Sequence, residues 1–125
     1  MEISRKKLIN DSDISYQKNR IIKTKEDLNG YVFNSSKRYI QGEREKYWFG
    51  YRVKNIDEIS MCRERFQVLV CRGKETITIS IPIPFIEGIK DSLNYSLDDN
   101  GEISHYHLVV FVDCGHATYC YQNQN

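Results

Sequence analysis

Alternation of apolar and polar residues predicts a strand between positions 47 and 53 of the chain. Side chains two positions apart in a strand point to the same face of the sheet. One face of this strand is apolar enough to form core, and it carries Tyr47, Phe49, Tyr51 and Val53. The opposite face carries Trp48, Gly50, Arg52 and Lys54. We therefore expect a strand with one buried aromatic face and one face that combines a tryptophan with cations.

A second pattern predicts a β-hairpin over residues 66–81. Gly73 and Lys74 suit a two-residue type II′ turn, because glycine favours the first central position. With that turn, Val70 lies opposite Ile77, and six apolar residues share one face: Phe66, Val68, Val70, Ile77, Ile79 and Ile81. A slip of one residue would divide these residues between the two faces.

A helix is predicted over residues 24–40. Thr24 is a typical N-cap, acidic residues follow it, and apolar residues recur at helical spacing up to Ile40. The stretch "GYVF" at 30–33 leaves a short strand open as an alternative. A second helix is expected from Pro84 onward, since proline is favoured in the first turn.

The last part of the chain completes the predicted sheet. Residues 103–112 are apolar on both faces and are expected to form a central strand, and residues 116–121 a return strand. The order of elements predicts an α+β domain with a mainly antiparallel sheet of about five strands and two helices. This single domain covers 24–125 and follows a polar N-terminal arm, 1–23.

Charge is distributed unevenly along the 125 residues. The net charge is +1, but residues 1–74 carry +7 and residues 75–125 carry −6. Such asymmetry indicates a surface that binds a polyanion, unless the fold mixes the two halves. The longest apolar runs are too short to cross a membrane, and no signal peptide is evident. The four cysteines form no CxxC pair. We expect a cytoplasmic protein with reduced thiols and no membrane contact.

The Trp48 face has the composition of a stacking surface for nucleic acid. A base can lie flat on the indole, Gly50 allows approach to the backbone, and cations meet phosphates. In the alternative arrangement, the 24–40 helix covers Trp48. The basic residues expected to contact phosphate are Arg52, Lys54, Lys37, Arg38, Arg63 and Arg65.

The histidines are candidate base-contacting or metal-binding residues. His105 and His107 share a strand face, and an H-x-H pair with a cysteine is one arrangement that holds zinc. However, the tight turn near Cys114 places His116 several residues away from that pair. We therefore predict no metal, no cofactor and no catalytic residue, and we expect His105 and His107 to stack on or read bases.

Three segments together resemble small recognition modules joined to restriction and other DNA-processing enzymes of bacteria. These segments are "YWFGY", "IPIPF" and "NYSLDDNGEISHYHLVV", and the likeness covers roughly residues 45–112. The resemblance implies DNA binding and transfers no individual functional residue.

The leading hypothesis is a non-catalytic nucleic-acid-binding domain, with DNA as the expected ligand, from a restriction or phage-defence system. One alternative is a protein-interaction module, such as an inhibitor or toxin–antitoxin subunit, whose acidic half binds a basic partner. Another is a small nuclease that depends on a metal ion. The sequence specifies neither the nucleic-acid sequence nor a partner protein or fused catalytic domain.

Overall fold

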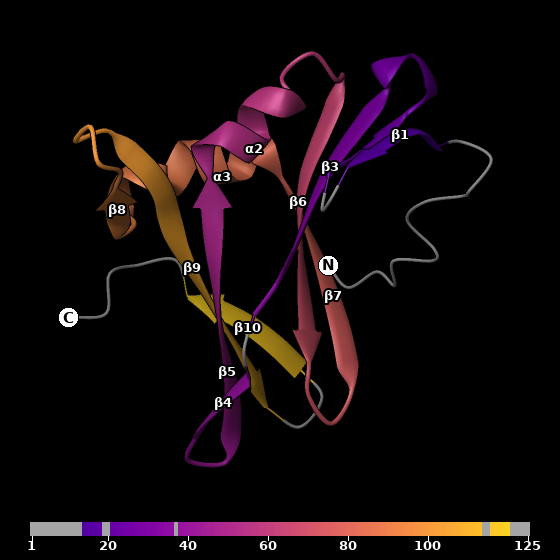
Figure 1. Cartoon of the computed structure of the whole chain (residues 1–125). Helices are drawn as coiled ribbons and strands as arrows, with labels where there is room; N and C mark the ends of the chain where they lie inside the picture. The colour runs from indigo at the N-terminus through magenta and orange to yellow at the C-terminus, as the bar shows by residue number, and fades with distance from the viewer. Residues whose placement is uncertain (1–13, 19–20, 37, 114–115, 121–125) are drawn as a thin grey trace.

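The computed structural model describes residues 14–18, 21–36, 38–113 and 116–120, with side chains for 21–36 and 38–113. The described strands divide between two sheets that face each other (Figure 1). We call them sheet A and sheet B. In each sheet, the side that faces the other sheet is mainly apolar. The main core therefore lies between the two sheets.

Sheet A has the strand order β1-β2-β3-β6-β7. Its neighbouring strands are antiparallel except for β3 and β6, which are parallel. The strands are β1 (Ile14–Lys18), β2 (Ile21–Thr24), β3 (Asn29–Ser35), β6 (Glu64–Arg72) and β7 (Thr76–Pro82). The first two come from the segment that was predicted as an N-terminal arm.

Sheet B has the strand order β10-β9-β5-β4, and β8 also pairs with β9. All of its pairings are antiparallel. The strands are β4 (Arg38–Gln41), β5 (Arg44–Arg52), β8 (Tyr95–Leu97), β9 (Ile103–Asp113) and β10 (His116–Cys120). The prediction that residues 103–112 form a central strand is confirmed, because β9 has β5 on one side and β8 and β10 on the other.

In the part of the chain that the structure describes, two short α-helices lie together at one end of the sheets, at the top of Figure 1. They are α2 (Val53–Glu58) and α3 (Ile83–Ile89), and the 3-10 turns are η2 (Lys25–Asp27) and η3 (Lys90–Ser92). Their buried residues, Ile56, Ile83 and Ile86, extend the core between the sheets. No helix in the described residues combines the length and apolarity needed to cross a membrane.

The buried face of β5 forms the centre of the core. Tyr47, Phe49 and Tyr51 are almost fully buried, and they belong to one cluster with Leu108 of β9 and Leu69 of β6. The alternation read from the sequence therefore holds from Tyr47 to Arg52. It ends there, because the chain enters α2 at Val53, so that Lys54 lies on a helix and does not continue the Trp48 face.

The α+β class with a mainly antiparallel arrangement is confirmed, but the expectation of one sheet of about five strands is wrong. The strands form two sheets because β5 and β6 each turn a mainly apolar, buried face toward the core, and such a face needs a partner layer. One sheet flanked by two short helices would leave one of those faces uncovered.

The predicted helix over residues 24–40 is also wrong. The segment instead forms η2, β3 and β4, which agrees with the alternative of a strand at "GYVF". Tyr31 and Phe33 point to one side of β3 and Val32 to the other, and β3 is hydrogen-bonded to β2 and to β6. Gly30 allows β3 to lie close to the segment after α2, because an added Cβ would lie 2.8 Å from Cys62 Sγ and from Ile59 Cβ.

The hairpin of β6 and β7 is confirmed, but its register differs by one residue from the prediction. Cys71 lies opposite Ile77 and Leu69 opposite Ile79, with Gly73 to Glu75 between the strands. Consequently Val68 and Val70 face the outer side of sheet A, whereas Ile77 and Ile79 face the core. Because β6 is apolar on both faces, the pattern of apolar residues does not distinguish the two registers.

Candidate nucleic-acid interface

The outer face of sheet B combines aromatic and basic side chains. The pairing of the strands brings these side chains together. Tyr39 of β4 lies opposite Lys46 of β5, and Gly50 of β5 lies opposite His107 of β9. Apart from Gly50, which is buried, the platform positions of β5 and β9 are exposed or half-buried and alternate with the buried core positions. We call this surface the platform and define it by Tyr39, Arg44, Lys46, Trp48, Gly50, Arg52, His105, His107 and Phe111.

Trp48 lies at the middle of the platform and is 36% exposed. The predicted alternative, in which a helix over residues 24–40 covers it, is excluded because that segment forms strands. Its ring meets His107 at a centroid distance of 5.0 Å and His105 at 5.8 Å, both edge-on. The indole is therefore held on its β9 side and remains accessible from solvent.

The two histidines form a stacked pair beside the indole. Their ring centroids are 5.4 Å apart, and Nε2 of His107 is 2.9 Å from the hydroxyl of Ser96 on β8. Burial lowers the pKa of both imidazoles from the ordinary value of 6.5, and Arg52 and His107 lower the pKa of His105 further. Both rings are thus neutral at pH 7 and gain charge only under acid conditions.

Three cations accompany the aromatic residues on β5. Arg44 lies with its guanidinium 4.0 Å from the ring centre of Phe111, an arrangement that holds a cation against an apolar surface. Lys46 and Arg52 follow at alternate positions on the same face. In the described part of β4, β5 and β9, the acid that shares this face is Asp113, at the far end of β9. The platform is consequently positive along β5.

A cavity of about 320 Å³ opens beside Trp48 on its β4 side. Its lining includes Tyr39, Trp48 and Arg52, which we call its walls, and Asn34 and Ser36, which we call its floor. The floor is held in place by two hydrogen bonds. The Trp48 amide donates to Ser36 Oγ over 2.9 Å, and Asn34 Nδ2 donates to the Gly50 carbonyl over 2.6 Å. We call this feature the Trp48 cavity.

The sequence-predicted site residues divide into two groups in the structure. Trp48, Arg52, His105 and His107 lie together on the platform, although they come from strands more than fifty residues apart in sequence. The others do not join them. Lys54 is exposed on α2, Arg63 is exposed before β6, Arg65 lines a separate cavity with Tyr51 and Glu87, and Lys37 lies outside the described residues.

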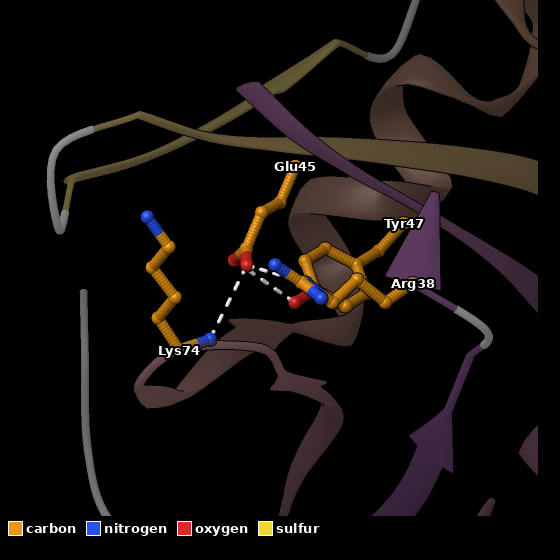
Figure 2. A network of polar contacts seen from close by, with 4 residues as sticks. All are labelled: Arg38, Glu45, Tyr47 and Lys74. Carbon is orange, nitrogen blue, oxygen red and sulfur yellow. Dashed lines mark hydrogen bonds and ion pairs between the residues drawn. The ribbon is translucent and has the colours of Figure 1, made fainter. Parts of the chain in front are cut away.

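Arg38 points away from the platform and forms an ion pair with the buried Glu45. Figure 2 shows this cluster, in which the carboxylate also accepts hydrogen bonds from the Tyr47 hydroxyl, at 3.1 Å, and from the backbone amide of Lys74, at 3.2 Å. Burial opposes ionisation of Glu45, but Arg38, Lys74 and Tyr47 together outweigh it and lower the pKa. Arg38 therefore has a structural partner in Glu45 and does not lie with Trp48 on the platform.

Sequence reasoning missed Tyr39, Arg44, Lys46 and Phe111 as members of the platform. The sequence pattern indicated Arg44 and Lys46, because they lie four and two residues before Trp48 in the strand and therefore point to the same face. Tyr39 and Phe111 lie on other strands, and only the pairing of β4 and β9 with β5 brings them to this face.

Among the described residues, no group of three or more His, Cys, Asp or Glu side chains is arranged to hold a metal ion. Cys114 lies outside those residues, and the side chain of His116 is not among those described. Comparison with protein-family models, with curated proteins and with solved structures finds no match to this chain. Its function must therefore be inferred from the geometry of the chain itself.

Proposed function

We propose that this chain is a non-catalytic nucleic-acid-binding domain, with DNA as the expected ligand and the platform as its contact surface. The observation that carries the proposal is the half-exposed Trp48, set among Arg44, Lys46 and Arg52 on one sheet face. An exposed tryptophan on a basic, flat surface offers stacking and phosphate contacts together, which is the combination that nucleic acid requires.

The spacing of the cations supports an extended ligand. Alternate residues of a strand are about 6.7 Å apart, so that Arg44 and Arg52 are separated by roughly 27 Å along β5. A surface of this length accommodates several nucleotides, as the sites of other sheet-based binding domains do. The resemblance to recognition modules of bacterial DNA-processing enzymes supports the same class of ligand and a role in restriction or phage defence.

The proposal predicts binding that weakens steeply with salt. If the platform neutralises three phosphates, affinity should fall about 20- to 40-fold between roughly 50 and 200 mM salt. Fluorescence anisotropy with labelled single-stranded and duplex oligonucleotides measures this. Arg52→Gln should weaken binding and reduce the salt slope by about one. The matched control is Arg72→Gln, which removes an exposed cation at the end of β6 on the other sheet.

Two results would contradict the proposal. One is the absence of binding to any oligonucleotide at low salt by a folded protein. The other is an equal loss of affinity in Arg52→Gln and Arg72→Gln, because that would indicate attraction by overall charge without a defined surface.

A protein-interaction module is the second candidate, and exposed apolar residues on strands of sheet B support it. Ile40 of β4 is 63% exposed, and Leu97 of β8 is 56% exposed. Unpaired strand edges with apolar side chains bind extended segments of partner proteins. This candidate predicts a stable complex with a protein, indifference to nucleic acid, and loss of that complex in Ile40→Lys or Leu97→Lys.

A further inference from the structure

We infer that the platform binds single-stranded nucleic acid and that one unpaired base lies in the Trp48 cavity, between Trp48 and Tyr39. This inference rests on the proposed function and specifies the form of the ligand. It depends on three features of the described residues. The histidines occupy one side of the indole and the cavity borders the other, the cavity walls are aromatic and basic, and hydrogen bonds hold the cavity floor.

The surroundings of Trp48 differ between its two neighbouring strands. On the β9 side, His105 and His107 meet the indole at interplanar angles of 87° and 66°. They fill the space in which a ligand ring would otherwise lie. On the β4 side, the indole borders the Trp48 cavity. A base that stacks on Trp48 therefore enters from the β4 side.

The walls of the cavity match the parts of one nucleotide. Tyr39, which is 50% exposed, provides a second aromatic ring on the opposite side from the histidines. Arg52 provides a permanent positive charge for a phosphate, and its fork of N–H groups suits phosphate oxygens. The volume of about 320 Å³ falls at the lower end of the range for small-molecule sites, ~300–1,000 Å³, so that it suits one base and not several.

The floor of the cavity is formed before any ligand binds. Hydrogen bonds of Asn34 to Gly50 and of Trp48 to Ser36 join β3, β5 and the intervening segment. Gly50 is buried, and a Cβ there would lie 3.3 Å from the His105 ring, so that this histidine occupies the space over the glycine. A preformed site loses less conformational entropy on binding, and this favours one geometry for the inserted base.

Duplex DNA does not present a base to such a cavity. Its bases are stacked inside the helix, and extruding one costs a few kcal/mol. In the described residues the platform is a sheet face without a helix projecting from it that would enter a groove. Single strands expose their bases for stacking on aromatic side chains, so that the same cations and rings serve them directly.

Tryptophan fluorescence reports whether a base stacks on Trp48, because Trp48 is the single tryptophan of the chain. We would titrate the full chain with a 12-nucleotide mixed-sequence single strand and with the blunt duplex of the same sequence, following tryptophan fluorescence and anisotropy together. We expect saturable quenching with the single strand. With the duplex we expect weaker binding and no quenching beyond the correction for absorbance.

Tyr39→Ala tests the position of the base. Loss of one stacking partner should weaken single-strand affinity about 5- to 150-fold. Tyr95→Ala is the matched control, since Tyr95 is similarly exposed on β8 and does not line the cavity. Both variants remove an exposed ring, and a thermal melt verifies that each remains folded.

The outcomes separate this inference from the proposed function. Equal or tighter binding of the duplex, or binding of the single strand without quenching, overturns the inference and leaves the proposed function standing. A single-strand affinity that is no weaker in Tyr39→Ala than in Tyr95→Ala places the base elsewhere and also overturns it. Failure of both ligands to bind at low salt overturns the proposed function and the inference together.

Discussion

At the scale of single residues, Gln67 is the most unusual member of the core. It lies on the inner face of β6, opposite Ile81, and is fully buried. Neither its amide nitrogen nor its amide oxygen has a hydrogen-bond partner among the described residues. A buried polar group without a partner loses its hydration and gains nothing in return, so that Gln67 reduces the stability of the folded state.

Gln67→Met should therefore increase the free energy of unfolding by about 1–3 kcal/mol, because methionine keeps the shape without the polar atoms. Urea unfolding followed by Trp48 fluorescence measures the change. Gln41→Met, at an exposed position of β4, is the control and should change stability by less than about 0.5 kcal/mol. An unchanged or lowered stability of Gln67→Met would indicate that the amide has a partner, such as a buried water.

At the scale of elements, Glu45 joins β5 to the turn between β6 and β7. Its carboxylate receives hydrogen bonds from Arg38, Tyr47 and the Lys74 amide, which belong to three different elements (Figure 2). Gly73 packs so closely against Glu45 and Tyr47 that any side chain at that position would collide with them. The cluster therefore holds the ends of the two sheets together, opposite the end where α2 and α3 lie.

Glu45→Gln should lower the free energy of unfolding at pH 7 by about 1.5–3 kcal/mol, the usual contribution of a hydrogen bond to a charged group. The pKa of Glu45 is lowered in the folded protein, so its contribution is complete above the ordinary value of 4.5 and is lost as pH falls through the folded pKa. The difference from wild type should consequently shrink below about pH 4.5.

Urea unfolding at several pH values between about 3 and 7 measures this difference. The control is Glu43→Gln, in the exposed turn between β4 and β5, which should have little effect at any pH. A gap between wild type and Glu45→Gln that stays constant down to pH 3 would contradict the assigned role of the ionised carboxylate.

The inward and outward faces of a strand with one apolar face could be predicted from the sequence, whereas the register of β6, which is apolar on both faces, could not. In β5, polar and aromatic positions alternate, and the predicted faces are correct. In β6, Val68 to Cys71 are all buried, so the hydrophobic pattern allows two registers. In the three-residue turn, Gly73 packs against Glu45 and Tyr47, which are far away in sequence and therefore not part of the local pattern. In β3, pairing with β2 and β6 outweighs the helical spacing.

At the scale of the whole molecule, the described basic residues of the first part of the chain are divided between the platform and other surfaces. The excess of Lys and Arg in residues 1–74 suggested a basic surface, and part of that excess lies on the platform as Arg44, Lys46 and Arg52. Arg38, however, is paired with Glu45, and Arg65 lies near Glu87. The location of the cations could not be predicted from sequence, because it depends on which strands pair and which carboxylates they meet.

Affinity for nucleic acid should rise as pH falls below about 6.5. The pKa values of His105 and His107 are lowered in the free protein, and a nearby phosphate favours the protonated rings. Each pKa unit by which the ligand raises the pKa of a histidine adds up to tenfold in affinity. Anisotropy titrations at about pH 7.5 and 5.5, at constant ionic strength, measure the effect.

His107→Gln should flatten this pH dependence, and His105→Gln should do so independently. Because the folded pKa values are lowered, the protein itself loses stability as pH falls through them, so circular dichroism at each pH must show a folded protein. A pH profile that both variants share with wild type would exclude the histidines from contact with the ligand.

The parallel pairing of β3 with β6 has a consequence for how the chain folds. These adjacent strands are separated in sequence by β4, β5 and α2, so closing sheet A brings together segments that are distant along the chain. Such non-local pairing costs loop-closure entropy before the hydrogen bonds between the strands can form. Domains rich in non-local pairing fold in milliseconds to seconds. A chain that ends before Glu64 would lack the strand that joins β3 to β7, and would leave the apolar face of β5 without its opposing layer.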